Sequence, residues 1–216
     1  MRRKRKVTDP EYEAISKAKR QAESNNVSGA VSTLESYLEG CPQSAKARIA
    51  LARTLIYDAK EVDRGIEQLS IVLEADADNV DALKASVTVL IKDKKNNKEV
   101  SEKYERLLVL EPSAEVYNGY ARFLRQQKLD FKRSAEFYEK AIRAAPGKYE
   151  YHQNYAVLLL NDIKDYQKAK EELEIVMKLN PGNASAKKNY DLLMKKKFDA
   201  DGNVKKGKFS AFKRNK

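Results

Sequence analysis

The chain has 216 residues, one cysteine and no tryptophan, and its formal net charge is +11. A single cysteine excludes an internal disulfide and a cysteine metal cluster, so the fold must hold together without covalent cross-links. Abundant Leu, Ala, Lys and Glu with only eight glycines favour helices over a turn-rich β architecture.

The positive charge is concentrated at the two ends of the chain. Residues 2–6 are all Lys or Arg, and residues 195–216 contain nine Lys or Arg against two Asp. The rest of the chain is therefore close to neutral. We expect any attraction to a polyanion to act through the ends before it acts through the body.

Neither a secretory signal nor a membrane span is predicted. The basic start is followed by charged residues instead of an apolar core, and the longest apolar runs fall far short of the roughly 20 residues that cross a bilayer. A lone cysteine also fits a reducing compartment. We therefore expect a cytoplasmic protein, or a nuclear one if the cell has a nucleus.

In chain order, residues 1–8 are expected to form a disordered basic leader, followed by a helical body at 9–197. Residues 198–216 are expected to form a flexible basic tail. Within the body, N-cap residues and apolar periodicity predict eleven helices and no strands. The predicted helices cover 10–23, 29–39, 44–58, 62–75, 79–92, 97–110, 114–127, 131–144, 149–160, 166–179 and 184–197.

A period of 34 or 35 residues organises these helices. It is marked by the closing positions Pro42, Ala77, Pro112, Pro146 and Pro181. Twelve, eight and five residues before each closing position lie a small, a large and an apolar residue, which share one helical face. The first helix of each unit has its own small residue, with leucine three positions later. The positions in the second helix are Ala30, Gly65, Val100, Ser134 and Ala169, then Leu34, Leu69, Tyr104, Tyr138 and Leu173, then Tyr37, Val72, Leu107, Ala141 and Val176; those in the first helix are Ala52, Val87, Ala121 and Ala156, then Leu55, Leu90, Leu124 and Leu159.

This pattern resembles the tetratricopeptide repeat (TPR) family, whose unit is a helix-turn-helix of 34 residues. The resemblance covers 10–181 as five repeats, with 184–197 as a C-terminal capping helix. It implies an all-α, right-handed α-solenoid of antiparallel helix pairs, a TPR-like superhelix whose first helices line a concave groove. The sequence departs from the family at the tryptophan of the first helix, which is replaced by Arg48, Leu83, Tyr117 and His152. The first unit is also degenerate, with Ile15, Ala18 and Ala22 as its obvious residues to bury.

The resemblance places a polar stripe of the first helices in this groove. Amides hydrogen-bond a peptide backbone and basic groups pair with carboxylates, so an acidic extended peptide or a partner helix is the expected ligand. The alternative, that these side chains are only solvated, remains open. The expected groove residues are Lys46, Arg53, Tyr57, Lys84, Thr88, Lys92, Asn118, Arg122, Arg125, Gln153, Asn154, Val157, Asn161 and Lys188.

The basic ends carry a second hypothesis, an RNA- or ribosome-associated factor. Phenylalanines interleaved with basic residues could stack on bases or enter an anionic lipid surface, and the leader also fits a nuclear-import patch. The residues concerned are Arg2, Arg3, Lys4, Arg5, Lys6, Lys205, Lys206, Lys208, Phe209, Phe212, Lys213 and Arg214. The sequence leaves the oligomeric state open.

No residue is predicted to be catalytic, and no cofactor or metal is expected. His152 is the only histidine and takes a packing position of the repeat, so we expect it to be buried and structural. Cys41 has no evident histidine partner and is expected to be inert. The segment DADGN at 199–203 lacks the glutamate that closes a calcium loop. We therefore predict a non-enzymatic adaptor that binds protein partners.

Overall fold

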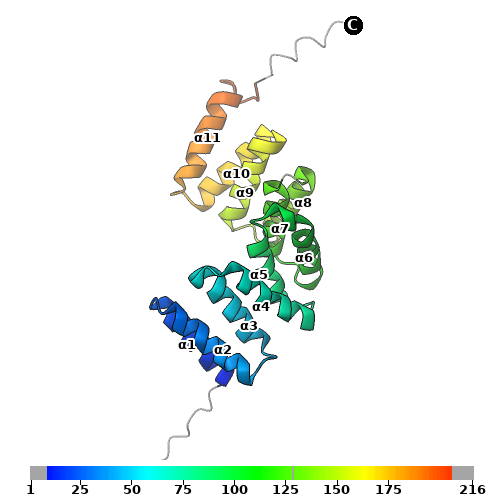
Figure 1. Ribbon diagram of the computed structural model, residues 1–216. Helices are drawn as coiled ribbons and strands as arrows, with labels where there is room; N and C mark the ends of the chain where they lie inside the picture. Colours follow the sequence, from blue (N-terminus) through cyan, green and yellow to red (C-terminus); the bar gives the residue numbers. More distant parts are fainter. Residues whose placement is uncertain (1–8, 128, 206–216) are drawn as a thin grey trace, which may run out of the picture. The chain divides into compact units, whose positions relative to one another are not determined.

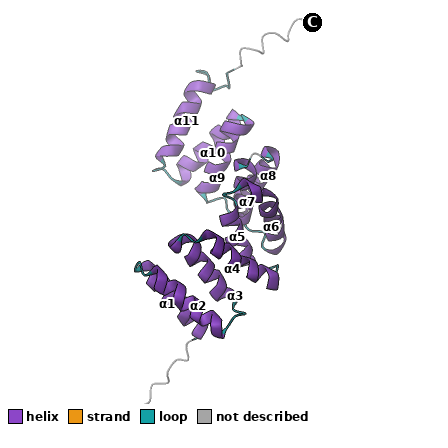
Figure 2. Ribbon diagram, viewed as in Figure 1, coloured by secondary structure: helices purple, strands orange, loops and turns teal. Residues whose placement is uncertain are grey.

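The computed structural model describes residues 9–127 and 129–205. In these residues it shows eleven α-helices and three short helical turns of other types (Figure 1). Loops connect the helices, and one further loop segment follows α11 (Figure 2). The prediction of an all-α chain with eleven helices is confirmed. The helices fall into an N-terminal unit that ends at Leu110 and a C-terminal unit that begins at Glu111.

The N-terminal unit contains three helix pairs, which we call repeats 1 to 3. The first helix of each pair is capped by a side chain that accepts a hydrogen bond from the backbone of the first turn: Asp9, Ser44 and Asn79. Repeat 1 is α1 (Pro10–Glu23) with α2 (Val27–Gly40); repeat 2 is α3 (Ala45–Thr54), the π-helical turn η1 (Leu55–Ala59) and α4 (Val62–Ala75); repeat 3 is α5 (Val80–Leu90), the 3-10 turn η2 (Lys94–Asn96) and α6 (Asn97–Leu110).

The C-terminal unit contains repeats 4 and 5 and one further helix. Ser113, Asp130, Asp165 and Asn183 cap α7, α8, α10 and α11 in the same way. Repeat 4 is α7 (Ala114–Gln126) with α8 (Phe131–Ala144); repeat 5 is α9 (Tyr149–Leu158), the π-helical turn η3 (Leu159–Ile163) and α10 (Tyr166–Leu179); the capping helix is α11 (Ala184–Lys197).

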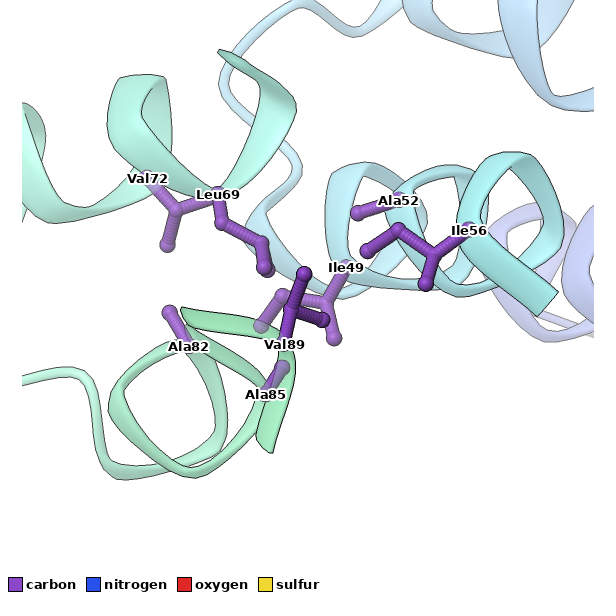
Figure 3. Packing of buried hydrophobic residues seen from close by; sticks show 8 residues of the cluster. All are labelled: Ile49, Ala52, Ile56, Leu69, Val72, Ala82, Ala85 and Val89. Carbon is purple, nitrogen blue, oxygen red and sulfur yellow. The ribbon is translucent and has the colours of Figure 1, made fainter. Parts of the chain in front are cut away.

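The core is built from the periodic positions of the sequence. All of the small, large and apolar helix positions of the repeat are buried except Tyr37, which is partly exposed. Figure 3 shows one cluster of the N-terminal unit, in which side chains of α3, η1, α4 and α5 meet. Since neither helix of a pair could bury its apolar face alone, packing against another repeat of the same unit stabilises it. The cluster contains Ile49, Ala52, Ile56, Leu69, Val72, Ala82, Ala85 and Val89.

Small residues of the second helix allow the two helices of a repeat to approach closely. A Cβ atom added at Gly65 would lie 2.4 Å from Cγ1 of Ile56 and 3.0 Å from the carbonyl oxygen of Ala52. At the equivalent position of repeat 4, the buried hydroxyl of Ser134 donates a hydrogen bond to the carbonyl of Ala121 at 2.8 Å. Only short side chains fit between the paired backbones.

Two first helices end differently from the prediction. The segments expected at 44–58 and 149–160 leave α-helical geometry after Thr54 and Leu158 and continue as π-helical turns. Lys60 and Lys164 end these turns in the left-handed conformation, with φ of 64° and 67°. A π turn is wider than an α turn, so it absorbs an additional residue before the chain reverses. Apolar periodicity does not encode this change of winding.

Residues 198–205, expected to lie in a flexible tail, instead form a short ordered turn. Phe198 is buried and forms an antiparallel bridge with Val204. The backbone amide of Lys205 donates to the carbonyl of Lys197 at 2.7 Å. The buried phenyl ring thus extends the ordered body beyond α11. Residues 1–8 and 206–216 lie outside the described residues.

Candidate functional site

A cavity of about 510 Å³ lies against α1 and α3 in the N-terminal unit. Its floor is apolar, because Ile15 and Ala22 of α1 and Ala50 of α3 are only partly buried there. Small residues at facing positions keep side chains from filling the space between the helices. The lining residues are Ile15, Ala18, Lys19, Ala22, Glu23, Leu34, Lys46, Ile49, Ala50, Arg53, Thr54, Tyr57, Asp58 and Asp81.

The charges around this cavity are balanced. Three basic residues line it together with three acidic ones. Lys19 pairs with Glu23 at 3.9 Å, and the ammonium group of Lys46 lies 3.5 Å from the carboxylate of Glu11. The cavity therefore offers apolar surface and no excess of basic charge.

Three of the six groove residues expected in the N-terminal unit line this cavity: Lys46, Arg53 and Tyr57. The other three, on α5 and just beyond it, do not. Thr88 donates to the carbonyl of Lys84 within its own helix at 2.8 Å, and Lys92 is exposed after the end of α5.

The sequence reasoning missed the contribution of α1 to this cavity. It identified Ile15, Ala18 and Ala22 only as residues to bury in a degenerate repeat. The structure buries Ala18 and leaves Ile15 and Ala22 partly open on the cavity wall. The useful signal was the small and apolar stripe of α1, facing another small residue, Ala50.

In the C-terminal unit, most of the expected polar groove residues bond to other residues of the unit. Arg125 pairs with Asp162 at 2.7 Å, and these side chains are 25% and 20% exposed. The amide of Asn154 donates to Asn118 at 3.0 Å. These contacts connect neighbouring repeats, so they stabilise the stack and leave less polar surface for a ligand. Arg122 is exposed.

The amide of Gln153 is used in the same way. Its Oε1 accepts a hydrogen bond from Asn183 at 2.7 Å, while the Oδ1 of Asn183 caps α11 by accepting from the amide of Ala186. The pair connects α9 to the start of α11. It therefore helps to position the capping helix.

The last three expected groove residues lie around α11. Val157 and Asn161 line a cavity of about 250 Å³ bordered by α9, η3, α10 and α11. Lys188 lines a depression of about 460 Å³ on the exposed face of α11. Leu192 borders both spaces and is 46% exposed.

His152 is buried, as predicted, but its contacts are polar. Nδ1 lies 2.7 Å from Oε2 of Glu172, and Nε2 lies 3.0 Å from the carbonyl oxygen of Pro146. Burial raises the pKa of Glu172, and the hydrogen bond to His152 opposes that shift. The side chain is 4% exposed and connects three segments of repeat 5, an arrangement that serves packing.

Two other candidates have local structural explanations. The carboxylate of Asp199 accepts hydrogen bonds from the backbone amides of Asp201 and Asn203, so DADGN is a turn held by its own first residue. No group of three potential metal ligands occurs in the residues that the structure describes. Cys41 is a free, exposed thiol.

Most of the residues proposed for polyanion binding lie outside the described part of the chain: Arg2, Arg3, Lys4, Arg5, Lys6, Lys206, Lys208, Phe209, Phe212, Lys213 and Arg214. Lys205 is described and exposed, and its ammonium group donates to the carbonyl of Lys195 at 3.0 Å. Among helices of the described residues, none has both the length and the apolar character that crossing a membrane requires.

Comparison with solved structures places this geometry in a known fold. A MamA RS-1 double mutant matches with a TM-score of 0.70 and 18% identity over 83% of this chain and 99% of its own. MamA from Desulfovibrio magneticus RS-1 matches with a TM-score of 0.69 and 17% identity over 83% and 99%. YrrB, described as a TPR protein with an unusual peptide-binding site, matches with a TM-score of 0.65 and 18% identity over 82% and 90%. No family model matches the sequence, and no curated protein matches it.

The chain is therefore an all-α solenoid with the tetratricopeptide repeat fold, in five helix pairs and a capping helix. The resemblance recognised in the periodic residues is confirmed at the level of the fold. MamA and YrrB are among the solved proteins whose backbones it resembles.

Proposed function

We propose that this protein is a non-enzymatic adaptor that binds a partner protein in the cavity between α1 and α3. The observation that carries the proposal is an open space of about 510 Å³ with an apolar floor, in a fold shared with a protein described by its peptide-binding site. Cavities of this size accommodate ligands that insert apolar groups. The expected occupant is a helix or extended segment that inserts large apolar side chains.

Arg53 and Tyr57, two residues of the expected stripe, line this cavity and support its use as a binding surface. Tyr57 is 45% exposed at the cavity wall, and an aromatic ring with a polar end is typical of binding surfaces. Arg53 and Asp58 stand near it and could pair with charged groups of either sign. Recognition would then depend on shape and apolar contact in the N-terminal unit, with charge as a secondary factor.

Photo-crosslinking tests the proposal. A benzophenone amino acid at Tyr57 is expected to capture a discrete partner in cells, and Ala50→Phe is expected to abolish that capture by filling the cavity. Lys92→Glu is the matched control, because Lys92 is exposed and does not line the cavity. Equal capture by Ala50→Phe and by the unsubstituted chain, at equal thermal stability, would reject this site.

The concentration of positive charge at the two ends favours a second candidate function, RNA or ribosome association. The appropriate deletion removes residues 1–8 and 206–216 and retains Phe198, because that ring is packed. This candidate predicts that the deletion abolishes binding to an oligouridine and removes a steep salt dependence. Unchanged binding of the oligouridine would show that the two ends are not the RNA-binding segments. A cytoplasmic site of action is part of both proposals.

A further inference from the structure

A second surface, independent of the cavity between α1 and α3, lies on α11. This helix packs against the body through Ala186 and Leu193, which are buried. Its position is held by the amide pair of Asn183 and Gln153 at 2.7 Å, and by the hydroxyl of Tyr190, which bonds to Glu174 of α10 at 3.0 Å. The opposite face of α11 is open.

The centre of the open face is apolar. Leu192 is 46% exposed and lies between the cavity of about 250 Å³ and the depression of about 460 Å³. Val157 and Leu160 line the cavity on one side of it, and Ala184 lines the depression on the other. An apolar side chain from another molecule would find contacts on both sides of this leucine.

Lysines surround this apolar centre. Those lining the two spaces are Lys164, Lys187, Lys188, Lys195, Lys196 and Lys197, and Asp191 is the single acidic residue among the lining residues. In the described part of the chain, no carboxylate pairs with Lys187, Lys188, Lys195 or Lys196. The surface therefore has a net positive charge that the body does not compensate, unlike the cavity between α1 and α3.

The nearby aromatic rings do not favour nucleic acid. The ammonium group of Lys197 lies 4.7 Å from the centre of the Tyr166 ring, and that of Lys170 lies 5.4 Å from the ring of the buried Phe198. Both rings already carry a cation on one face, so they are poor platforms for stacking a base. The basic groups are all lysines, which act as point charges and lack the fork that grips a phosphate in two places.

We propose that this surface, which we call the Leu192 face and define by Val157, Leu160, Lys164, Lys188, Leu192, Lys195 and Lys196, binds an acidic protein segment. The segment would insert an apolar side chain beside Leu192 and place carboxylates opposite the lysines. Charge would speed association and make it salt-dependent, while apolar contact would supply most of the affinity. The site extends the adaptor to two partners, or to two segments of one partner.

The experiment uses the full chain and a fluorescent synthetic peptide in which glutamates and leucines alternate at helical spacing. Binding is followed by anisotropy across a series of salt concentrations. Leu192→Asn is expected to weaken binding at least about tenfold, since an exposed leucine loses its apolar contact. Lys188→Glu with Lys196→Glu is expected to weaken binding and flatten the salt dependence. Ala50→Phe is expected to change nothing, which separates this site from the first.

The matched controls are on α10. Leu179 is 41% exposed and Lys178 is exposed, and neither lines the two spaces. Leu179→Asn and Lys178→Glu are therefore expected to bind the peptide as the unsubstituted chain does. Equal losses for Leu192→Asn and Leu179→Asn would overturn the proposal.

Three other results would also overturn it. If a peptide with serine in place of leucine bound equally well, the face would recognise charge alone. If an oligouridine, or vesicles containing phosphatidylserine, displaced the peptide and bound independently of Leu192, the face would be a general polyanion site. If sedimentation showed a dimer that Leu192→Asn dissociates, the occupant would be a second copy of this chain.

Discussion

His152 and Glu172 form a buried polar contact across repeat 5, with 2.7 Å between Nδ1 and Oε2. The equivalent residues of repeat 2, Arg48 and Gln68, are joined by a hydrogen bond of 2.8 Å. In both repeats the first-helix residue contacts one residue twenty positions later in the second helix. The contact therefore belongs to the repeat and is made with different chemistry in each copy.

The same first-helix residues also bind the loop that precedes their repeat. Nη2 of Arg48 donates to the carbonyl of Pro42 at 2.8 Å, and Nε2 of His152 lies 3.0 Å from the carbonyl of Pro146. Both ring nitrogens of His152 thus lie within hydrogen-bonding distance of oxygen atoms, one of Glu172 and one of Pro146. One side chain of the first helix therefore connects the preceding loop to the second helix of the repeat.

In repeats 3 and 4 the residues at these two positions differ and form no hydrogen bond of this kind in the described residues. Tyr117 and Phe137 place their ring centres 6.2 Å apart, and Leu83 and Lys103 line the same small cavity beside α6. The tryptophan position of the family is thus occupied by four different residues, and the residue twenty positions later differs in each repeat as well.

Removing one partner of the pair His152–Glu172 should lower the free energy of unfolding more, per substitution, than replacing both partners. His152→Leu leaves the carboxylate of Glu172 buried without its partner, so the free energy of unfolding should fall by about 1–3 kcal/mol. Adding Glu172→Gln removes the unpaired carboxylate and should recover part of the loss. Urea denaturation of the single and double variants measures the coupling; strictly additive losses would contradict the pairing.

Gly65 should not tolerate a methyl group. The added Cβ would lie 2.4 Å from Cγ1 of Ile56, so Gly65→Ala should destabilise the chain by about 1–3 kcal/mol through overpacking. Gly40→Ala is the control, because a Cβ there meets nothing within 4 Å. Ile56→Ala removes the clashing atoms, so Gly65→Ala should cost less in that background. Equal melting temperatures for Gly65→Ala and Gly40→Ala would refute the close approach.

Arg125 and Arg122 should contribute differently to stability, although both were expected to bind a ligand. Arg125 pairs with Asp162 at 2.7 Å in a partly buried setting, whereas Arg122 is exposed. Arg125→Ala should lower the free energy of unfolding by about 1 kcal/mol, with the change for Arg122→Ala smaller than about 0.5 kcal/mol. Adding Asp162→Ala to Arg125→Ala should bring little further loss. Thermal melts at low and high salt provide the measurement.

Alkaline pH should destabilise the C-terminal unit through Tyr155. Burial raises the pKa of this tyrosine from 10.0 to about 12, so the folded state holds the phenol proton more tightly than the unfolded chain. Its contribution to stability is complete below pH 10 and is lost as the pH rises toward 12, at up to about 1.4 kcal/mol per pH unit. Burial also raises the pKa of Tyr138, which adds to the same decline.

Tyr155→Phe should make this decline shallower, because one titrating group is removed. The substitution also removes the hydrogen bond of 2.8 Å to Glu139, so it should lower stability at neutral pH. Tyr12→Phe, at an exposed position, is the control and should leave the slope unchanged. Denaturation midpoints measured across the alkaline range distinguish these results. An identical slope for Tyr155→Phe and the unsubstituted chain would contradict the assignment.

Much of the fold was predictable because its signals are local and repeated. A small residue such as Gly65 or Ser134 recurs at a fixed distance from each closing position, and such spacing marks a helix face wherever it occurs. Six helices were predicted to the residue: 10–23, 62–75, 97–110, 131–144, 166–179 and 184–197. The π turns were not, since Leu55–Ala59 and Leu159–Ile163 continue the same apolar pattern at a different winding.

The candidate sites were less predictable, because the fate of a polar side chain depends on residues distant in sequence. Asn118 and Asn154 looked like ligand groups, yet they bond to each other across thirty-six positions. Arg125 finds Asp162 in the same way. By contrast, the cavity wall formed by Ile15 could be recognised only once α1 and α3 had been placed side by side.

The sequence by itself determined the class of this protein, its five repeats and the faces that each helix buries. Apolar periodicity sets these, because burial is non-directional and depends on which face a residue occupies. Only the tertiary structure decided which polar groups remain for a partner. Hydrogen bonds and ion pairs need particular atoms within about 3 Å of one another, and that distance exists only after the helices have packed.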